Sequence, residues 1–446
     1  MGLRAELRTL LRLAGPLALG EFVTMLGGGV TTMMLGRLSA EAVGIQGLGA
    51  ILFFSLMIFG LDLMLGLDYP VAYAVGAGRP AEAGAFLVQG CWLALALAGV
   101  LSGALRYGVP LLIIHLDLNP VVAGPVSAYL HILMLGVPPL LLWVACRRYL
   151  QGRGMTRAVL VALLTAFALE VSCKWVLIFG RLGIPALGVN GSAWGAVIEF
   201  YWLGGAGAAL VWWSRPRTSS RWSFRPDPER MRQIVRLGAP AATRAMAEVG
   251  VFAAATTLAA RLDTTSLAAH QLVMSAASLA FMIPLGLGAG TAVRVGNALG
   301  ARDSRAARQA GWAGIASAAV VMAGTGLVFL LAPRLVLRAY TTDQAVIEAG
   351  VPLIYCAAAF QLFDGVQAVA TGALRGSGDT RTPLLVNLVA HWGLALPLGW
   401  ALCFRWHYGI VGLWLGLALG LMIVGVVLIA VWARRARRLS AYTPIM

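Results

Sequence analysis

Charged side chains are scarce in this chain, and their scarcity argues against an ordinary soluble protein. Only 12% of the 446 residues are charged, whereas 60% are hydrophobic. Apolar runs of twenty or more residues recur along the whole length, which is far more than a soluble core requires. The composition therefore indicates a polytopic membrane protein that is embedded in the lipid bilayer.

Paired cysteines, nucleotide-binding loops and ligand clusters are also absent from the sequence. The five cysteines lie in or beside apolar runs without the spacing of a metal or redox site, so we interpret them as packing residues: Cys91, Cys146, Cys173, Cys356 and Cys403. The G-x-x-x-x-G-K-[ST] loop that binds nucleotide phosphates is missing, which argues against direct drive by ATP. No His, Asp and Glu cluster has ligand spacing, so we expect a protein that uses no cofactor and is not an enzyme.

Basic residues outnumber acidic ones and give a net charge of +16, but they punctuate the apolar runs instead of gathering on one face. We therefore expect no nucleic-acid partner. The apolar runs predict twelve transmembrane helices. Their expected bounds are 14–36, 45–76, 84–107, 124–149, 156–181, 188–214, 233–260, 266–297, 307–331, 345–373, 380–404 and 409–433.

The distribution of the basic residues predicts the orientation of the chain. With the loops assigned alternately to two sides, 24 of the 34 Lys and Arg residues fall on the side of the N-terminus and seven on the other. Positive residues accumulate on the cytoplasmic side, so we expect both termini in the cytoplasm and a location in the plasma membrane, the inner membrane of a bacterium. The stretch "MGLRAELRTLLRLAGP" has no small-residue cleavage site and predicts a cytoplasmic lead-in helix.

Several landmarks recur at a constant offset of 224 residues. They are Pro16 with Pro240, Gly66 with Gly290, Gly76 with Gly300, and "QGRGMTR" at 151–157 with "RGSGDTR" at 375–381. The offset predicts two six-helix halves that enter the membrane in the same sense, as in transporters with parallel repeats. We expect an N-terminal lobe at 1–213, a cytoplasmic linker at 214–231 and a C-terminal lobe with a basic tail at 232–446. Together they should form a V-shaped, all-α bundle around a central cavity that works by alternating access.

Seven acidic residues lie inside the predicted spans and away from their ends, where an uncompensated charge is costly. They are Glu21, Asp62, Asp68, Glu170, Glu199, Glu248 and Asp364. Glu170 and Lys174 are four residues apart with the acid first, and Arg244 and Glu248 are four apart in the reverse order, so each pair can form a helical ion pair. Asp364 has no basic residue within one helical turn, and it needs a partner on another helix, a bound cation or a proton.

Several stretches, in this order, resemble the MATE (multidrug and toxic compound extrusion) family of transporters. They are "PLALGEFVTMLGGGVTTMMLGRLSAEAV", "VGAGRPAEAG", "LQGRGMTR", "GIPALGVNGSAWGAV", "NALGARDSRAARQAG" and "LRGSGDTRTP". The resemblance extends from about Pro16 to Trp432. It implies a secondary active transporter that exports amphipathic, mostly cationic organic compounds and drugs in exchange for H+ or Na+.

The stretches "MAEVGVF" and "FQLFDGVQ" are similar to the NorM-type branch of that family. This similarity implies that Glu248 and Asp364 take part in cation coupling, with a Na+ site at these two carboxylates as one alternative. Gln361 and Gln367 lie three residues on either side of Asp364, and we expect at least Gln361 to supply a polar contact. We expect Asp364 to exchange a proton while Glu248, one turn from Arg244, stays ionised.

The N-terminal half departs from the NorM-type pattern in two places. Thr31 stands where an aspartate is usual, and Glu170 with Lys174 replaces a frequent N-x-x-x-D pattern. An ammonium group at position 174 opposes a bound metal cation in this half. Three further acids can form a proton-handling site of their own: Glu21, Asp62 and Asp68. Asp68, two residues before Pro70, equally fits a structural role as a helix-distorting residue.

The cargo is the least constrained part of the prediction. Aromatic side chains can add cation–π contacts to a carboxylate site, and the candidates, each also compatible with plain packing, are Tyr69, Phe252 and Phe360. A flippase for a lipid-linked precursor is the alternative within transport. When the residues near the span ends are assigned to the loops, the spans contain seven acidic residues against three basic ones, Lys174, Arg244 and Arg294, which favours cationic cargo. We expect the transporter to be a monomer.

Overall fold

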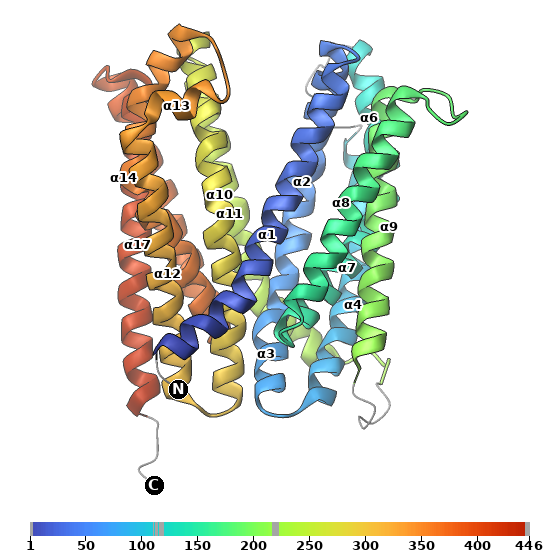
Figure 1. Ribbon diagram of the computed structural model, residues 1–446, viewed down its shortest axis with the longest axis vertical. Helices are drawn as coiled ribbons and strands as arrows, with labels where there is room; N and C mark the ends of the chain where they lie inside the picture. The colour runs from blue at the N-terminus through green and yellow to red at the C-terminus, as the bar shows by residue number, and fades with distance from the viewer. Residues whose placement is uncertain (1–2, 110, 112–114, 116–119, 216–222, 442–446) are drawn as a thin grey trace. The chain divides into compact units, whose positions relative to one another are not determined.

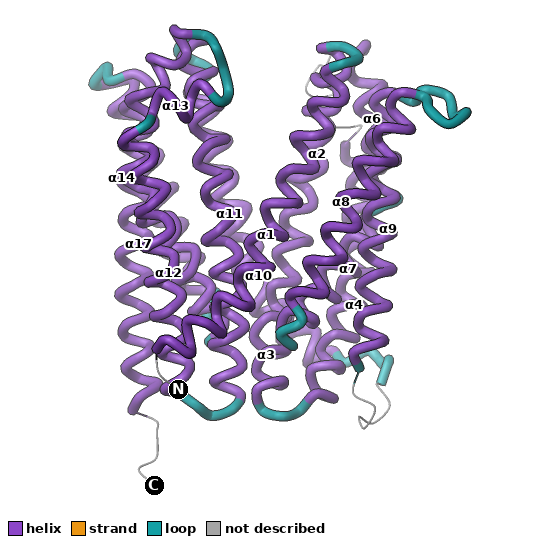
Figure 2. Tube along the Cα trace, viewed as in Figure 1, coloured by secondary structure: helices purple, strands orange, loops and turns teal. Residues whose placement is uncertain are grey.

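The computed structural model describes residues 3–109, 111, 115, 120–215 and 223–441, and helices account for nearly all of them (Figures 1 and 2). No strand occurs in these residues, and the cysteines are all free thiols. The predicted all-α class is therefore confirmed. Backbone hydrogen bonding explains this result, because a segment in hydrocarbon must satisfy its N–H and C=O groups internally.

The helices follow one another with short connections. Their bounds are α1 (Leu3–Gly36), α2 (Ala40–Leu63), α3 (Asp68–Gly76), α4 (Pro80–Gly103), α6 (Pro120–Met134), α7 (Val137–Gly152), α8 (Thr156–Phe179), α9 (Gly188–Ser214), α10 (Pro228–Ala259), α11 (Thr264–Gly300), α12 (Ser304–Leu331), α13 (Pro333–Arg338), α14 (Gln344–Gly376), α15 (Arg381–Asn387), α16 (Leu396–Trp400) and α17 (Gly409–Ala441). A 3-10 turn, η1 (Met64–Leu67), joins α2 to α3, and π-helical turns occupy Ala104–Gly108, Leu388–Ala395 and Ala401–Arg405.

Ten helical spans in the described residues are long and apolar enough to cross a membrane, or eleven when the bent pair α6 and α7 counts as one. The remaining long helix is α10, whose apolar part carries Arg244 and Glu248 and is therefore less hydrophobic. Each of the twelve predicted windows thus contains a helix. The chain is a multi-pass membrane protein.

One predicted helix, 124–149, is broken in the structure. Val122–Met134 and Val137–Gly152 meet at an angle of 48°. Gly136 lies so close to α9 that an added Cβ would be 2.6 Å from the Phe200 ring, and two prolines follow it in the first turns of α7. Proline lacks the N–H that a continuous helix would need, so the chain bends here.

The helices form two compact units, but the chain is not simply divided between them at its middle. The N-terminal unit contains residues 22–242, and the C-terminal unit contains residues 1–21 and 243–446. The start of α1 therefore packs with α11, where an added Cβ on Gly290 would lie 3.0 Å from Ala14. The start of α10 packs with η1 in the corresponding way, since a Cβ on Gly66 would lie 2.1 Å from the Ile234 carbonyl oxygen. This close approach explains why glycine recurs at 66 and 290.

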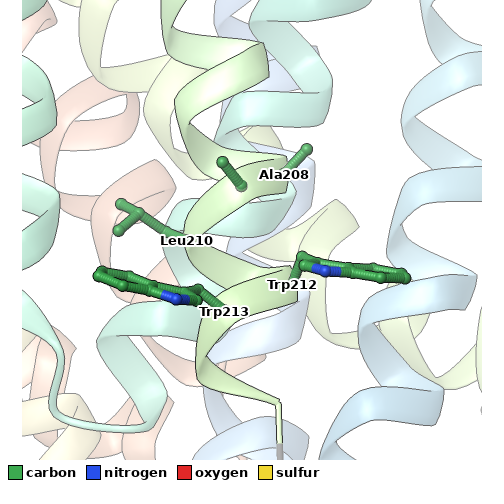
Figure 3. Close-up of a pocket in the computed structure, with 5 residues that line it drawn as sticks. Ala208, Leu210, Trp212 and Trp213 are labelled. Atoms are coloured by element: carbon green, nitrogen blue, oxygen red, sulfur yellow. The ribbon is translucent and has the colours of Figure 1, made fainter.

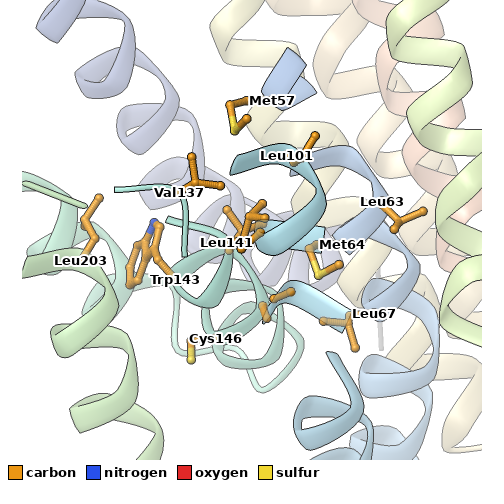
Figure 4. Close-up of a cluster of buried hydrophobic side chains, with 14 of the residues drawn as sticks. Met57, Leu63, Met64, Leu67, Leu101, Val137, Leu141, Trp143, Cys146 and Leu203 are labelled. Atoms are coloured by element: carbon orange, nitrogen blue, oxygen red, sulfur yellow. The ribbon is translucent and has the colours of Figure 1, made fainter. Parts of the chain in front are cut away.

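Each unit has its own apolar core. In the N-terminal unit, buried side chains of α2, η1, α4 and α7 interlock, and Figure 4 shows Met57, Met64, Leu141 and Trp143 among them. In the C-terminal unit, α17 supplies Trp414 and Trp432, both almost fully buried. Polar side chains within these units are therefore held in apolar surroundings, which makes their partners informative.

Candidate functional site

Two carboxylates of the C-terminal unit meet at one amide side chain. Asp364 and Gln367 lie on α14 and are buried, and Glu248 lies on α10. The Nε2 group of Gln367 donates to Asp364 Oδ1 over 3.2 Å and to Glu248 Oε1 over 3.4 Å. An amide nitrogen can only donate, so both carboxylate oxygens act as acceptors. Gln367 therefore bridges the two acids.

The charge of this group is unbalanced. Arg244 and Glu248 form the ion pair predicted from their spacing, and their side chains are 18% and 16% exposed. Asp364 forms no ion pair with any described residue, and no described residue donates a hydrogen bond to its Oδ2 atom. With all three groups ionised, the cluster carries one net negative charge. A single proton or monovalent cation would neutralise it.

Tight packing fixes the position of Asp364. An added Cβ on Gly365 would lie 2.3 Å from Met322 of α12, and one on Gly372 would lie 2.2 Å from the Gly288 carbonyl oxygen of α11. The backbone of α14 therefore lies directly against both neighbouring helices. From this position on α14, Gln367 reaches Glu248 of α10.

The other candidates of the C-terminal unit have different surroundings. Gln361 is fully buried, but neither its amide oxygen nor its nitrogen has a hydrogen-bond partner in the described residues. The polar contact expected from Gln361 is thus made by Gln367. Phe360 stacks on Trp414 with ring centres 6.2 Å apart, whereas Phe252 is half-buried. Glu21 is half-buried and has a polar or electrostatic partner.

The N-terminal unit contains a second buried polar cluster. Glu170 and Lys174 of α8 form the predicted ion pair, and the ammonium group of Lys174 also donates to Thr31 Oγ1 of α1 over 2.7 Å. The pair is therefore tied to α1 at the residue that replaces the expected aspartate.

The remaining candidate acids of the N-terminal unit have other surroundings. Asp68 is buried at the start of α3, with its Oδ1 3.9 Å from Arg148 Nε of α7. Asp62 is half-buried, and Tyr69 packs against Tyr73 with ring centres 5.6 Å apart. Among the described residues, no three His, Cys, Asp or Glu side chains are placed to hold a metal ion.

Two long-range polar contacts were not predicted from the sequence. Glu6 of α1 receives two hydrogen bonds from Arg294 of α11, from Nε over 2.9 Å and from Nη2 over 2.8 Å. His270 of α11 is fully buried between Thr256 and Trp414, which lie 2.9 Å and 3.1 Å from its ring nitrogens. Indole N–H can only donate, so Nδ1 accepts from Trp414 and His270 is a neutral packing residue. Sequence separations of 288 and 144 residues leave no local signal for either contact.

A cavity of about 540 Å³ near the end of α9 is not part of these clusters. It is lined by Ala208, Ala209, Leu210, Trp212 and Trp213. In Figure 3 the two indole rings extend on opposite sides of the helix, and Trp213 is 88% exposed. Exposed tryptophans at a helix end are typical of the membrane interface. None of the candidate site residues lines this cavity.

Comparison with known proteins identifies the family. The sequence profile of the MatE family matches residues 16–176 and again residues 240–401. The chain is 34% identical over 445 residues to the "Probable multidrug resistance protein NorM" of Mesorhizobium japonicum, covering 97% of this chain and 95% of that one. It is 35% identical over 449 residues to the "Multidrug resistance protein PmpM" of Pseudomonas aeruginosa, covering 98% and 93%. The chain belongs to the MATE family.

Solved MATE structures have the same fold. The eukaryotic MATE transporter AtDTX14 aligns with a TM-score of 0.87 at 20% identity, covering 98% of this chain and 99% of that one. An outward-facing multidrug resistance MATE transporter aligns with a TM-score of 0.87 at 18% identity, covering 97% and 96%. The two profile matches begin 224 residues apart, which is the offset of the sequence landmarks. As a MATE protein, the chain is a membrane transporter and not an enzyme, and its twelve helices form two lobes.

Proposed function

We propose that this MATE transporter exports amphipathic, mostly cationic organic compounds by alternating access, in exchange for H+ or Na+. The names of the NorM and PmpM relatives support drugs as the cargo class. The excess of acidic over basic residues in the spans supports a cationic cargo. The same excess does not favour the flippase alternative, because anionic lipid headgroups would call for basic residues.

Asp364 and Glu248 are the proposed coupling carboxylates. The bridge through Gln367 is the observation that carries this assignment, since it brings two acids to one place beside a single arginine. One cation is needed for neutrality there, and a buried group with an unbalanced charge has a strong tendency to acquire one. The cation enters from outside, and its release inside resets the site.

The two carboxylates have different roles in the proposal. Glu248 stays ionised because Arg244 balances it. Asp364 takes the proton, and Oδ2 is the atom available for it because Oδ1 accepts from Gln367. For Na+ to replace the proton, both carboxylates must be ionised and further neutral oxygens must complete its coordination. Drug and cation then compete for the same negative charge, which is the physical basis of exchange.

The remaining assignments complete the proposal. The transporter is placed in the inner membrane of a bacterium. Both of its termini are placed in the cytoplasm, because basic residues concentrate on the side of the N-terminus. The transporter is proposed to act as a monomer. Lobes at 1–213 and 232–446, joined by a linker at 214–231, are proposed as the bodies that rock around the central cavity, with the start of α1 moving with the C-terminal unit on which it packs.

The test is uphill transport by purified protein in proteoliposomes under an imposed proton or sodium gradient. Asp364→Asn keeps the shape and hydrogen-bonding capacity of the side chain and removes its charge, so we expect coupled drug uptake to be lost while insertion and folding are preserved. Glu348→Gln is the matched control, since this acid lies on the same helix but is 47% exposed. Asp364→Asn protein that transports at the wild-type rate under either gradient would refute the assignment.

A further inference from the structure

The ammonium group of Lys174 is held by oxygen ligands in the interior of the N-terminal unit. The side chains of Glu170 and Lys174 are only 9% and 7% exposed. The Thr31 hydroxyl donates to the Gly27 carbonyl oxygen over 2.8 Å, so its own oxygen is free to accept from Lys174. A carboxylate and a hydroxyl oxygen thus face the same positive charge.

The surrounding helices are shaped around this pair. An added Cβ on Gly27 of α1 would lie 2.8 Å from Glu170 Oε2. One on Gly195 of α9 would lie 2.4 Å from Lys174 Cγ. Glycine at both positions lets α1 and α9 approach α8 closely enough to enclose the charges. The pair is therefore built into the helix packing and is not a chance surface contact.

A second carboxylate lies nearby. Glu199 of α9 is half-buried and interacts electrostatically with both Glu170 and Lys174. The ammonium group of Lys174 balances the charge of the Glu170 carboxylate. Removal of the ammonium group would leave the buried carboxylate of Glu170 without a counter-charge, and this would favour the binding of a replacement cation.

We propose that Lys174 is a tethered cation, which fills a monovalent-cation site in the N-terminal unit and keeps mobile cations out of it. The ligands available to the ammonium group are those that a sodium ion or a small alkylammonium ion would use. Because the lysine is covalently attached, its effective concentration at the site exceeds that of any free ion. The N-terminal unit therefore needs no exchangeable cation. This assignment does not depend on the roles of Asp364 and Glu248.

The experiment replaces the tethered cation with a free one. Lys174→Ala removes Cγ, Cδ, Cε and Nζ, the heavy atoms that n-propylammonium supplies. The variant is made in the Asp364→Asn background, so that the acid pair of the C-terminal unit has lost its titratable aspartate. Thermal unfolding of the purified protein in detergent is measured with increasing n-propylammonium or Na+, with choline keeping the ionic strength constant.

We expect Tm of the Lys174→Ala variant to rise with the logarithm of the n-propylammonium or Na+ concentration, as for a ligand that binds only the folded state. The Asp364→Asn parent, which keeps Lys174, should show no such rise. The variant that also carries Glu170→Ala should show none either, because the carboxylate ligand is gone. A Lys174→Ala protein that is folded but responds no more than its parent would overturn the proposal, since the pair would then be only a structural ion pair.

A second variant covers the case in which Lys174→Ala does not fold. Lys174→Gln fills most of the lysine's volume but leaves Glu170 without a counter-charge. Its Tm should rise with Na+ relative to choline, and the rise should disappear when Glu170→Ala is added. Equal Tm in Na+ and choline for Lys174→Gln would refute the tethered-cation role.

Discussion

The contact between Glu6 and Arg294 allows a sharp test of how burial controls the value of an ion pair. Two bidentate pairs in this protein have nearly the same geometry. Arg294 meets Glu6 with hydrogen bonds of 2.9 and 2.8 Å, and Arg334 meets Glu348 with 3.0 and 2.9 Å. Their exposures differ greatly, since Glu6 is 1% and Arg294 20% exposed, whereas Arg334 and Glu348 are 55% and 47% exposed.

Removal of one partner of a buried ion pair leaves the other charge buried and unpaired. We expect Arg294→Ala to destabilise the protein by about 3–5 kcal/mol, because the carboxylate of Glu6 has no access to water. Glu6→Ala should cost less, about 1–3 kcal/mol, because the partly exposed guanidinium can reach solvent. The double variant should be more stable than the sum of the two losses predicts, by about 2 kcal/mol or more. The corresponding changes at Arg334 and Glu348 should have no measurable effect.

Unfolding by increasing SDS in mixed micelles gives the four free energies of each double-mutant cycle. Amide hydrogen exchange locates the loss, which should appear first in residues 6–21 of α1, since this segment packs in the C-terminal unit. Additivity of the two buried substitutions within about 0.5 kcal/mol would refute the reasoning. So would an equally large coupling energy at the exposed pair.

Two further predictions concern single side chains. Gln367→Leu removes the bridging donors, and since hydrogen bonds to charged groups contribute about 1.5–3 kcal/mol each, we expect at least a tenfold loss of drug efflux in cells. Gln361→Leu is its control, because the buried amide has no hydrogen bond to lose, and an equal loss of efflux in both variants would contradict the bridging role. Hydrogen bonds from the Ser266 hydroxyl and backbone N–H hold the pKa of Asp263, the N-cap of α11, below its usual value. Its ionised form therefore adds stability above the ordinary aspartate pKa of about 3.9, and this stability is lost as pH falls through the lowered pKa. Asp263→Asn should keep the cap and abolish that pH dependence in thermal unfolding, whereas Asp263→Ala should cost about 0.5–2 kcal/mol near neutral pH. An unchanged acid dependence in Asp263→Asn would show that other groups cause it.

The helices themselves were predictable because hydrocarbon permits few alternatives. Apolar length between charged or glycine-rich breaks located all twelve segments, and the helix ends lie within a few residues of the predicted ones in most cases. The bend between α6 and α7 was missed, although Gly136 and the two prolines after it mark the site. The π-helical turns were not predicted. The 3-10 turn η1 ends directly before Asp68, the residue whose place two positions before Pro70 indicated a possible helix distortion.

The sequence predicted the local contacts of the candidate site residues but not their long-range contacts. The ion pairs of Glu170 with Lys174 and of Arg244 with Glu248 follow from four-residue spacing on a helix. Lys174 and Thr31 are 143 residues apart in the sequence, so their contact could be found only from the three-dimensional structure. Spacing alone could not decide which glutamine meets Asp364, because positions three residues before and after it are equivalent on one face.

Comparison of the two halves of the internal repeat distinguishes residues that the fold requires from residues that the chemistry requires. Glycines recur at positions 66 and 290 because a helix crosses closely at each, so both halves keep them. The charged residues of the two polar clusters do not recur. The position 224 residues before Asp364 is Leu140, the one before Glu248 is Thr24, and the one after Lys174 is Leu398.

The two polar clusters therefore arose on equivalent scaffolds but at different places, and they carry their positive charge in different ways. In the N-terminal unit the lysine is covalently attached and stands between a carboxylate and a hydroxyl. In the C-terminal unit the arginine balances one carboxylate and leaves Asp364 uncompensated. A charge that is fixed to the chain cannot be exchanged across the membrane, whereas an uncompensated carboxylate becomes neutral only when it binds a proton or another cation. The asymmetry thus agrees with the proposal that a cation is exchanged in the C-terminal unit, while a fixed ammonium group takes its place in the N-terminal unit.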